Sequence, residues 1–149
     1  MKLTTKGHYA VKALLDLSLH PPHQPISVNS IAHRQNLPAP YLEKILITIR
    51  RAGLIKSIRG VQGGYMLAHP PSAISIGAIL TAVGDKIEPL NSIEVEKNSN
   101  SPADWVTVSL WQKLNQKLKD AIFEISLADL YYDARSRQAS LGESSNFII

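Results

Sequence analysis

Apolar side chains recur at intervals of three and four residues in three segments of the first half of the chain, a spacing that places them on one face of a helix. The first segment spans residues 6–19, and the second spans residues 28–35, where Ser27 is a suitable N-cap. The third begins at Pro40 and ends near Gly53, because proline suits the first turn of a helix and glycine its C-terminus. The predicted buried faces comprise Tyr9, Ala10, Ala13, Leu14 and Leu17; Ile31; and Leu42, Ile45, Leu46 and Ile49.

Two short apolar segments separated by glycines follow the third predicted helix. Residues 54–58 and 64–67 are predicted to pair as the strands of a hairpin, with Arg59 in the tip between them. Helix, short turn, helix and hairpin in this order predict a winged helix-turn-helix, in which the third helix is the recognition helix and the hairpin is the wing. The predicted fold class is therefore mainly α with a small β-hairpin wing.

A polar stretch separates the predicted winged helix from the rest of the chain. A fourth helix, capped by Ser75, ends at Gly84, and the residues after it have the irregular polar composition of a flexible loop. We therefore expect a winged helix-turn-helix domain at residues 1–84, a flexible loop at 85–101, a long helix and a short following helix at 102–133, and a mobile polar tail at 134–149.

The long helix carries a continuous apolar stripe. It begins at Pro102 and extends for about 22 residues, roughly 33 Å, which is longer than a small winged helix needs to cover its own core. Apolar residues at this spacing are typical of helices that pair with a second helix, so we predict a dimerisation helix. Packing of the stripe on its own domain is the alternative. The predicted dimer interface comprises Trp105, Val108, Trp111, Leu114, Leu118, Ile122 and Ile125.

The charge distribution points to a polyanionic partner. Residues 1–60 contain nine Lys or Arg and two Asp or Glu, whereas residues 61–149 contain seven and ten, within a net charge of +4. A basic first half joined to an acidic second half is typical of a nucleic-acid-binding lobe attached to another unit. The predicted DNA-binding residues are Lys2, Tyr41, Glu43, Lys44, Thr48, Arg50, Arg51, Arg59 and Gln62. The alternative is a winged-helix protein-interaction module that no longer reads DNA.

Several other classes of protein are not supported by the sequence. The chain has no cysteine, so disulfides and thiolate metal sites are excluded. No apolar run is long enough to span a membrane, and Lys12 and Asp16 interrupt the N-terminal segment, which we interpret as a helix of a cytoplasmic protein rather than a signal peptide. His20 and His23 flank two prolines and are predicted to be exposed rather than metal-binding. No catalytic motif is present, and we expect no enzyme activity.

Six stretches of the chain resemble a known family. They are MKLTTKGHYAVKALLDLSLH, PYLEKIL, RRAGLIKSIRG, GGYML, ISIGAIL and LWQKLNQKLKDAIFEISLADL, and together they are similar to the Rrf2 family of bacterial winged-helix transcription regulators, which includes IscR. The resemblance implies a homodimer that binds an imperfect palindrome in promoter DNA, and we expect this regulator to act as a repressor. It implies that the recognition helix, beginning near Tyr41 and Glu43, enters the major groove and that Arg59 enters the minor groove.

The sequence departs from the family pattern at the expected sensing site. Many members hold an iron–sulfur cluster through three cysteines, whereas Trp105 and Val108 stand where the resemblance places the last cysteine and a histidine. We therefore expect no cofactor, and a response to a regulatory protein or to a small effector, for which a pocket beside Trp105 and Trp111 is the predicted place. The turn before the recognition helix is Pro38-Ala39-Pro40 rather than serine-rich, which predicts a different base preference.

Overall fold

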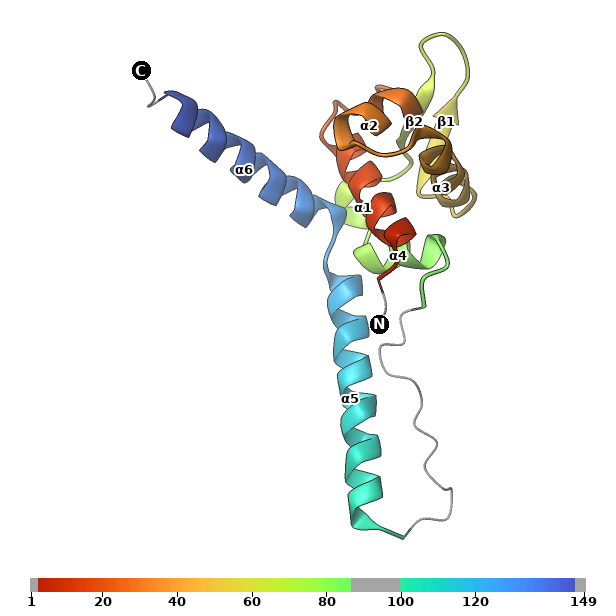
Figure 1. Cartoon of the computed structure of the whole chain (residues 1–149), viewed down its shortest axis with the longest axis vertical. Helices are drawn as coiled ribbons and strands as arrows, with labels where there is room; N and C mark the ends of the chain where they lie inside the picture. The colour runs from red at the N-terminus through yellow and green to blue at the C-terminus, as the bar shows by residue number, and fades with distance from the viewer. Residues whose placement is uncertain (1–2, 87–99, 147–149) are drawn as a thin grey trace.

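The structure is a computed structural model that describes residues 3–86 and 100–146. Helices α1 to α4 and a two-stranded hairpin form a globule, and α5 and α6 extend from it in different directions (Figure 1). This confirms the predicted fold class. The elements are α1 (Thr5–Ser18), α2 (Val28–Gln35), α3 (Ala39–Arg51), β1 (Ile55–Ile58), β2 (Gly64–Leu67), the short 3₁₀ helix η1 (Pro71–Ala73), α4 (Ile76–Ala82), α5 (Pro102–Glu124) and α6 (Leu127–Asn146).

Local capping explains where the helices of the globule begin and end. The hydroxyls of Thr4, Ser27 and Ser75 each accept a hydrogen bond from the backbone N–H three residues later, at 2.9, 3.1 and 3.0 Å. Gly53 has a φ of 82°, and its N–H donates to the carbonyl of Arg50 at 2.9 Å, which closes α3. The predicted caps at Ser27, Ser75 and Gly53 are confirmed.

The core lies between α1, α2, α3, α4 and the inner face of the hairpin, and the start of α6 adds Leu127 to it. Burying one leucine or isoleucine side chain contributes about 1.5–3 kcal/mol, so this apolar contact dominates the stability of the globule. Tyr9 is only partly buried. The other predicted core residues are buried, namely Ala10, Ala13, Leu14, Leu17, Ile31, Leu42, Ile45, Leu46 and Ile49.

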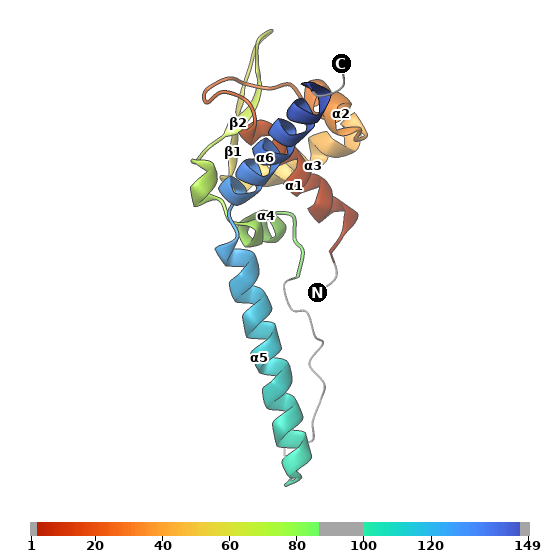
Figure 2. The ribbon, with the colours of Figure 1, turned by 90° about the vertical axis from the view of Figure 1, so that its left-hand side faces the viewer.

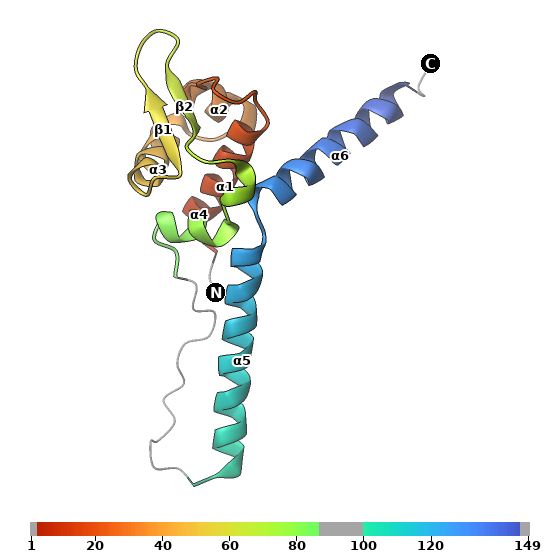
Figure 3. The same ribbon diagram turned by 180° about the vertical axis from the view of Figure 1, so that it is seen from behind.

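The hairpin is joined to the helix-turn-helix through the backbone. β1 and β2 pair antiparallel, with Ile55 opposite Leu67. On the other edge of β2, the loop before α2 adds an isolated bridge, in which Ile26 N donates to Tyr65 O at 2.9 Å and Tyr65 N donates to Ile26 O at 2.8 Å. The base of the wing is therefore fixed on both sides, while its tip extends beyond the helices (Figure 3).

A buried carboxylate joins α1 to α2. Asp16 is 2% exposed and accepts two hydrogen bonds from Arg34, at 3.0 and 2.8 Å, and one from Gln35 at 2.8 Å. Burial by itself raises the pKa of Asp16, but the hydrogen bonds from Arg34 and Gln35 and the charge of Arg34 outweigh it and lower the pKa below its usual value. The ionised carboxylate therefore holds the C-terminal ends of both helices together.

The last helix is longer than the sequence predicted. Ser126 N donates to Asp129 Oδ2 at 2.8 Å and Asp129 N donates to Ser126 Oγ at 3.2 Å, and this reciprocal cap begins the helix that follows α5. The predicted polar tail from Ala134 is corrected, because α6 continues to Asn146. The segment after Ala134 is polar but contains arginine, glutamine and alanine, which favour a helix, and no proline. Residues 87–99 of the predicted loop and residues 147–149 lie outside the described residues.

The C-terminal end of α5 packs on α4, whereas the rest of α5 points away from the globule (Figure 2). The ring of Phe123 lies over Gly77, where an added Cβ would come within 2.6 Å of it. Ile76 N also donates to Ile125 O at 2.9 Å. These contacts fix the direction in which α5 leaves the globule. Within residues 3–86 and 100–146, no helix combines the length and apolar character that a membrane span needs.

Replacing Asp16 with asparagine should lower the free energy of unfolding by about 2 kcal/mol at pH 7, because Arg34 loses its charged partner. Urea denaturation at a fixed protein concentration measures this difference. Asp133→Asn, which changes an exposed residue of α6, is the matched control and should change stability by less than about 0.5 kcal/mol.

The effect of Asp16→Asn should depend on pH in one direction. Since the pKa of Asp16 is lower in the folded than in the unfolded chain, its stabilisation is fully present above the unfolded pKa of about 4 and is lost as the pH falls through the folded pKa. The two proteins should therefore converge in stability in acid. A difference that is undiminished at about pH 2 would contradict the role assigned to this carboxylate.

Candidate nucleic-acid interface

Helix α3 presents a polar face on the side opposite its buried residues. Leu42, Ile45 and Ile49 face the core, which leaves Glu43 and Lys44 exposed to solvent. This separation follows from the helical spacing of the apolar residues. Helix α3 can therefore offer one carboxylate and one ammonium to base edges or phosphates without disturbing its packing.

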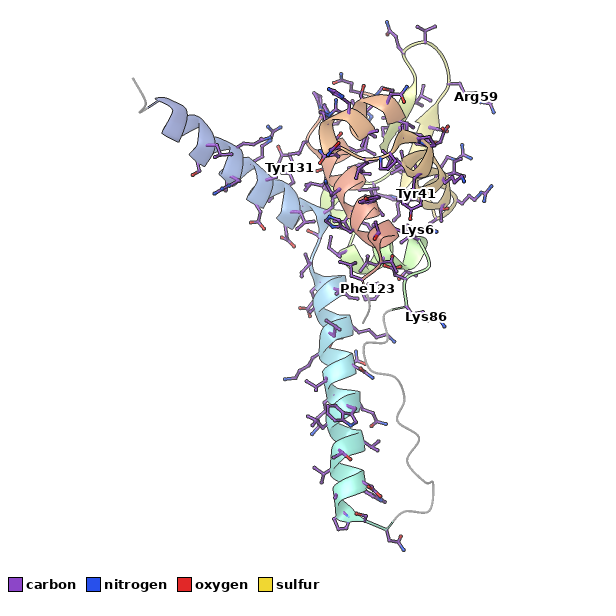
Figure 4. All side chains as sticks on the ribbon, viewed as in Figure 1. Lys6, Tyr41, Arg59, Lys86, Phe123 and Tyr131 are labelled. Carbon is purple, nitrogen blue, oxygen red and sulfur yellow. The ribbon has the colours of Figure 1, made fainter. Side chains whose placement is uncertain are left out.

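Tyr41 stands at the start of this polar face in a fixed orientation. Its ring meets the ring of Tyr9 edge-on, with centroids 5.8 Å apart and planes at 73°, and the side chain remains 38% exposed. Figure 4 shows Tyr41 where α1 and α3 meet. An edge-to-face aromatic pair restricts the orientation of both rings, so the exposed part of the Tyr41 side chain has a defined position on this face. The sequence predicts Tyr9 only as a core residue and does not indicate its contact with Tyr41.

The end of α3 is tied to the first strand of the wing. The guanidinium of Arg50 donates through Nη1 to Ser57 Oγ at 3.3 Å, and Arg51 is exposed beside it. Thr48 is half-buried, and its hydroxyl donates to the carbonyl of Lys44 at 3.1 Å, which leaves its oxygen lone pairs available as acceptors. Ser57 was not predicted as a site residue, because a serine at a polar strand position carries no distinctive signal.

The wing tip presents Arg59 and Gln62 to solvent, and Figure 4 shows Arg59 directed away from the hairpin. The tip is a tight turn in which Gly63 N donates to Gly60 O at 3.0 Å, and Gly60 has a φ of 121°. A Cβ at Gly63 would overlap the carbonyl of Ile58. Glycine at these positions is therefore required by the turn itself, and it also keeps the tip narrow.

The surface formed by α3 and the hairpin carries mainly positive charge. Between residues 39 and 67 the sequence contains five Lys or Arg and one acidic residue, Glu43. Asp16, the nearest acidic residue before α2, is already paired with Arg34. The basic side chains of α3 and the hairpin are Lys44, Arg50, Arg51, Lys56 and Arg59, and all five are exposed. Such a surface favours binding of phosphates. Lys2 lies outside the described residues.

Most of the predicted dimer interface lies along α5. Trp105 is 73% exposed and Leu114 is 43% exposed, whereas Val108, Trp111 and Leu118 are half-buried. Ile125, at the end of the helix, is also exposed. Ile122 is only 7% exposed in the single chain, because this end of α5 lies on α4, and its place in a dimer interface stays a prediction. The predicted effector pocket beside Trp105 and Trp111 stays a prediction.

A recognition helix with an outward polar face, followed by a basic hairpin, defines a winged helix-turn-helix DNA-binding protein. The chain belongs to the Rrf2 family, since residues 3–133 match that family, which is described as an iron-dependent transcriptional regulator. It is 56% identical over 149 residues, the full length of both chains, to the helix-turn-helix-type protein slr0846 of Synechocystis sp..

Solved structures support the same assignment. The chain is similar to T. potens IscR, with 39% identity, a TM-score of 0.72, and coverage of 93% of this chain and 91% of that one. It is also similar to CymR, the global cysteine regulator of B. subtilis, with 35% identity, a TM-score of 0.75, and coverage of 89% and 97%. The family and CymR are described as regulators, and this protein is a transcription regulator rather than an enzyme.

The residues of this chain do not fit an iron–sulfur cluster. The family description names iron, and the soft thiolate ligands that such clusters need are absent, because the sequence contains no cysteine. Among the residues that the structure describes, no group of three or more His, Asp or Glu is arranged to hold a metal ion. The chemistry of the donor set therefore differs from that of the cluster-binding members.

Replacing Gly64 with alanine should weaken the attachment of the wing. A Cβ at Gly64 would overlap the carbonyl of Ile26, so the bridge between Ile26 and Tyr65 must open. We expect a loss of about 1–3 kcal/mol in the free energy of unfolding and faster hydrogen exchange at the Tyr65 amide.

Gly142→Ala is the matched control, because Gly142 lies in α6 with nothing near an added Cβ. This change should leave stability unchanged or raise it by up to about 1 kcal/mol, since alanine favours a helix. Equal behaviour of the two variants would show that the bridge does not hold the wing.

Proposed function

We propose that the protein is a repressor that binds a palindromic promoter site as a homodimer and does so without an iron–sulfur cluster. The observation that carries this proposal is the continuity of the polar face of α3 with the basic wing. A DNA-binding regulator acts where promoter DNA lies, so the proposal also places the protein in the cytoplasm.

Each part of the surface has a distinct role in the proposed complex. The outward face of α3 enters the major groove, where Glu43 accepts a hydrogen bond from cytosine N4 and repels phosphate, so it discriminates between bases. Lys44, Arg50 and Arg51 contact phosphates and fix the register of the helix on the duplex. Arg59 enters the minor groove, whose negative potential is strongest in narrow A·T-rich segments.

The apolar stripe of α5 supports a second copy of the chain as the partner. Trp105, Leu114 and neighbouring apolar residues lie on a helix that extends into solvent beyond its contact with α4. A two-fold axis through paired α5 helices would place two recognition helices on one side of the DNA, and a palindromic site follows from that symmetry.

The test of the proposed function is selection of binding sites from a pool of random duplexes at about physiological salt. We expect an imperfect palindrome, bound at least about 10³-fold more tightly than a scrambled duplex. Recovery of no common sequence would favour the alternative function, a winged-helix module that binds another protein.

Arg59→Ala should cost about 1–3 kcal/mol of binding free energy at the selected site, because the minor-groove contact is lost. Fluorescence anisotropy with a labelled duplex measures this. Arg137→Ala, at an exposed position on α6, removes the same charge away from the wing and should have little effect. Equal affinities of wild type and Arg59→Ala would remove the minor-groove role.

Leu114→Glu should convert the dimer to a monomer, because it places a charge in the centre of the apolar stripe. Lys113→Glu, on the opposite side of α5, is the control and should remain dimeric. Sedimentation equilibrium measures the mass of each. A dimeric Leu114→Glu protein would show that α5 is not the interface.

A further inference from the structure

A cavity of about 360 Å³ lies between the base of the hairpin and the loop that joins α1 to α2. The loop supplies His20 and His23, and the hairpin supplies Lys56 of β1 and Met66 of β2. Figure 2 shows this loop running beside the hairpin. The volume lies within the range of cavities that hold small molecules. Neither the recognition helix nor the dimer helix contributes to it.

The lining has the chemistry of a site for an organic anion. Its titratable side chains are the imidazoles of His20, His23 and His69 and the ammonium of Lys56, and no Asp or Glu lines it. The remaining surface is largely apolar and rich in proline. Lys56 supplies a permanent positive charge, and the imidazoles supply polar contacts. A ligand with a carboxylate and an apolar body matches both parts of this lining.

Two of the imidazoles are held in place by other groups. The Nε2 atom of His69 donates to the carbonyl of Gly53 at 3.1 Å, and Nε2 of His20 lies 3.4 Å from the buried carboxylate of Asp16. Fixed side chains lose less conformational entropy when a ligand binds. These contacts therefore favour a defined site over a surface groove.

The third imidazole belongs to a residue whose backbone is strained. His23 has a φ of 64°, in the left-handed region that residues other than glycine rarely occupy. Such strain is concentrated at ligand clamps and switch regions. It provides a reason for the HPPH sequence at residues 20–23, which DNA binding and dimerisation leave unexplained.

We propose that this cavity binds a small organic carboxylate with an apolar body, and that its occupancy controls the position of the wing. The loop ends in Ile26, which is hydrogen-bonded to Tyr65 of β2, so a ligand that contacts both the loop and Lys56 joins the two sides of the wing base. Restricting the wing changes the placement of Arg59. The coupling to DNA rests on the proposed function, whereas the binding of the anion does not.

The test uses 3-phenylpropionate as the probe and its neutral amide, 3-phenylpropanamide, as the matched control. The imidazole signals of the full-length protein are followed by NMR at pH 7 as each compound is added. We expect saturable shifts of His20, His23 and His69 with the carboxylate. His8 and His33 do not line the cavity and should not shift, so they serve as internal controls. The amide should bind at least about 10-fold more weakly, since it lacks the charge.

Lys56→Gln should weaken binding of the carboxylate by about 10-fold, because the ion pair with the ligand is lost. Lys86→Gln removes the same charge at the far end of the globule from Arg59, as Figure 4 shows, and should leave the affinity unchanged. No saturable shift, equal shifts of all five histidines, or equal affinity for the amide would each overturn the site.

The effect of carboxylate binding on DNA affinity is measured separately, so its absence can be distinguished from failure of the proposed function. At saturating 3-phenylpropionate, the affinity of wild type for its selected duplex should change by at least about 3-fold, and the duplex should change the affinity for the carboxylate by the same factor. Carboxylate binding with an unchanged DNA affinity would overturn the control of the wing. A protein that bound no DNA would instead overturn the proposed function.

Discussion

The buried carboxylate of Asp16 is the constraint on which the arrangement of the candidate DNA-binding surface depends. It receives three hydrogen bonds from Arg34 and Gln35 at the end of α2, so α2 cannot rotate on α1 without leaving a charge buried and unpaired. Helix α3 follows α2 after a short turn, and the loop before α2 is hydrogen-bonded to the wing through Ile26. The hydrogen bonds of Asp16 therefore help to position the recognition helix, the wing and the loop that carries His20.

Much of the globule could be predicted because its signals are local. Helical spacing of apolar residues, a hydroxyl at Ser27 and a glycine at residue 53 each act within a few positions of the element that they define. The hydrogen bonds of Asp16 were not predicted, since its partners lie 18 and 19 residues away in the sequence. A single aspartate on the apolar face of the first helix is a signal that could have indicated a buried partner. The length of α6 was underestimated, because the polar composition of the chain after Ala134 resembles that of a tail.

The same distinction applies to the candidate site. The outward residues of α3 and the arginine of the wing followed from periodicity and from the position of the hairpin. The supports of these residues, Tyr9 for Tyr41 and Ser57 for Arg50, depend on tertiary contacts that no spacing encodes. Ile122 belongs to the helical stripe in sequence, yet it is buried, because the direction of α5 is set by Phe123 on Gly77. The absence of cysteine removes the ligands that an iron–sulfur cluster needs, whereas the polar face of α3 and the basic wing contain no position that depends on cysteine.

The central claim is that the polar face of α3 and the basic wing bind DNA. The salt dependence of binding tests this claim most directly. Fluorescence anisotropy of the wild-type protein with DNA from upstream of its own gene should show a loss of about 10³-fold in affinity between 50 and 200 mM salt, as expected for about six phosphate contacts per dimer. A scrambled duplex should bind far more weakly at every salt concentration. An affinity that does not change with salt would contradict the claim.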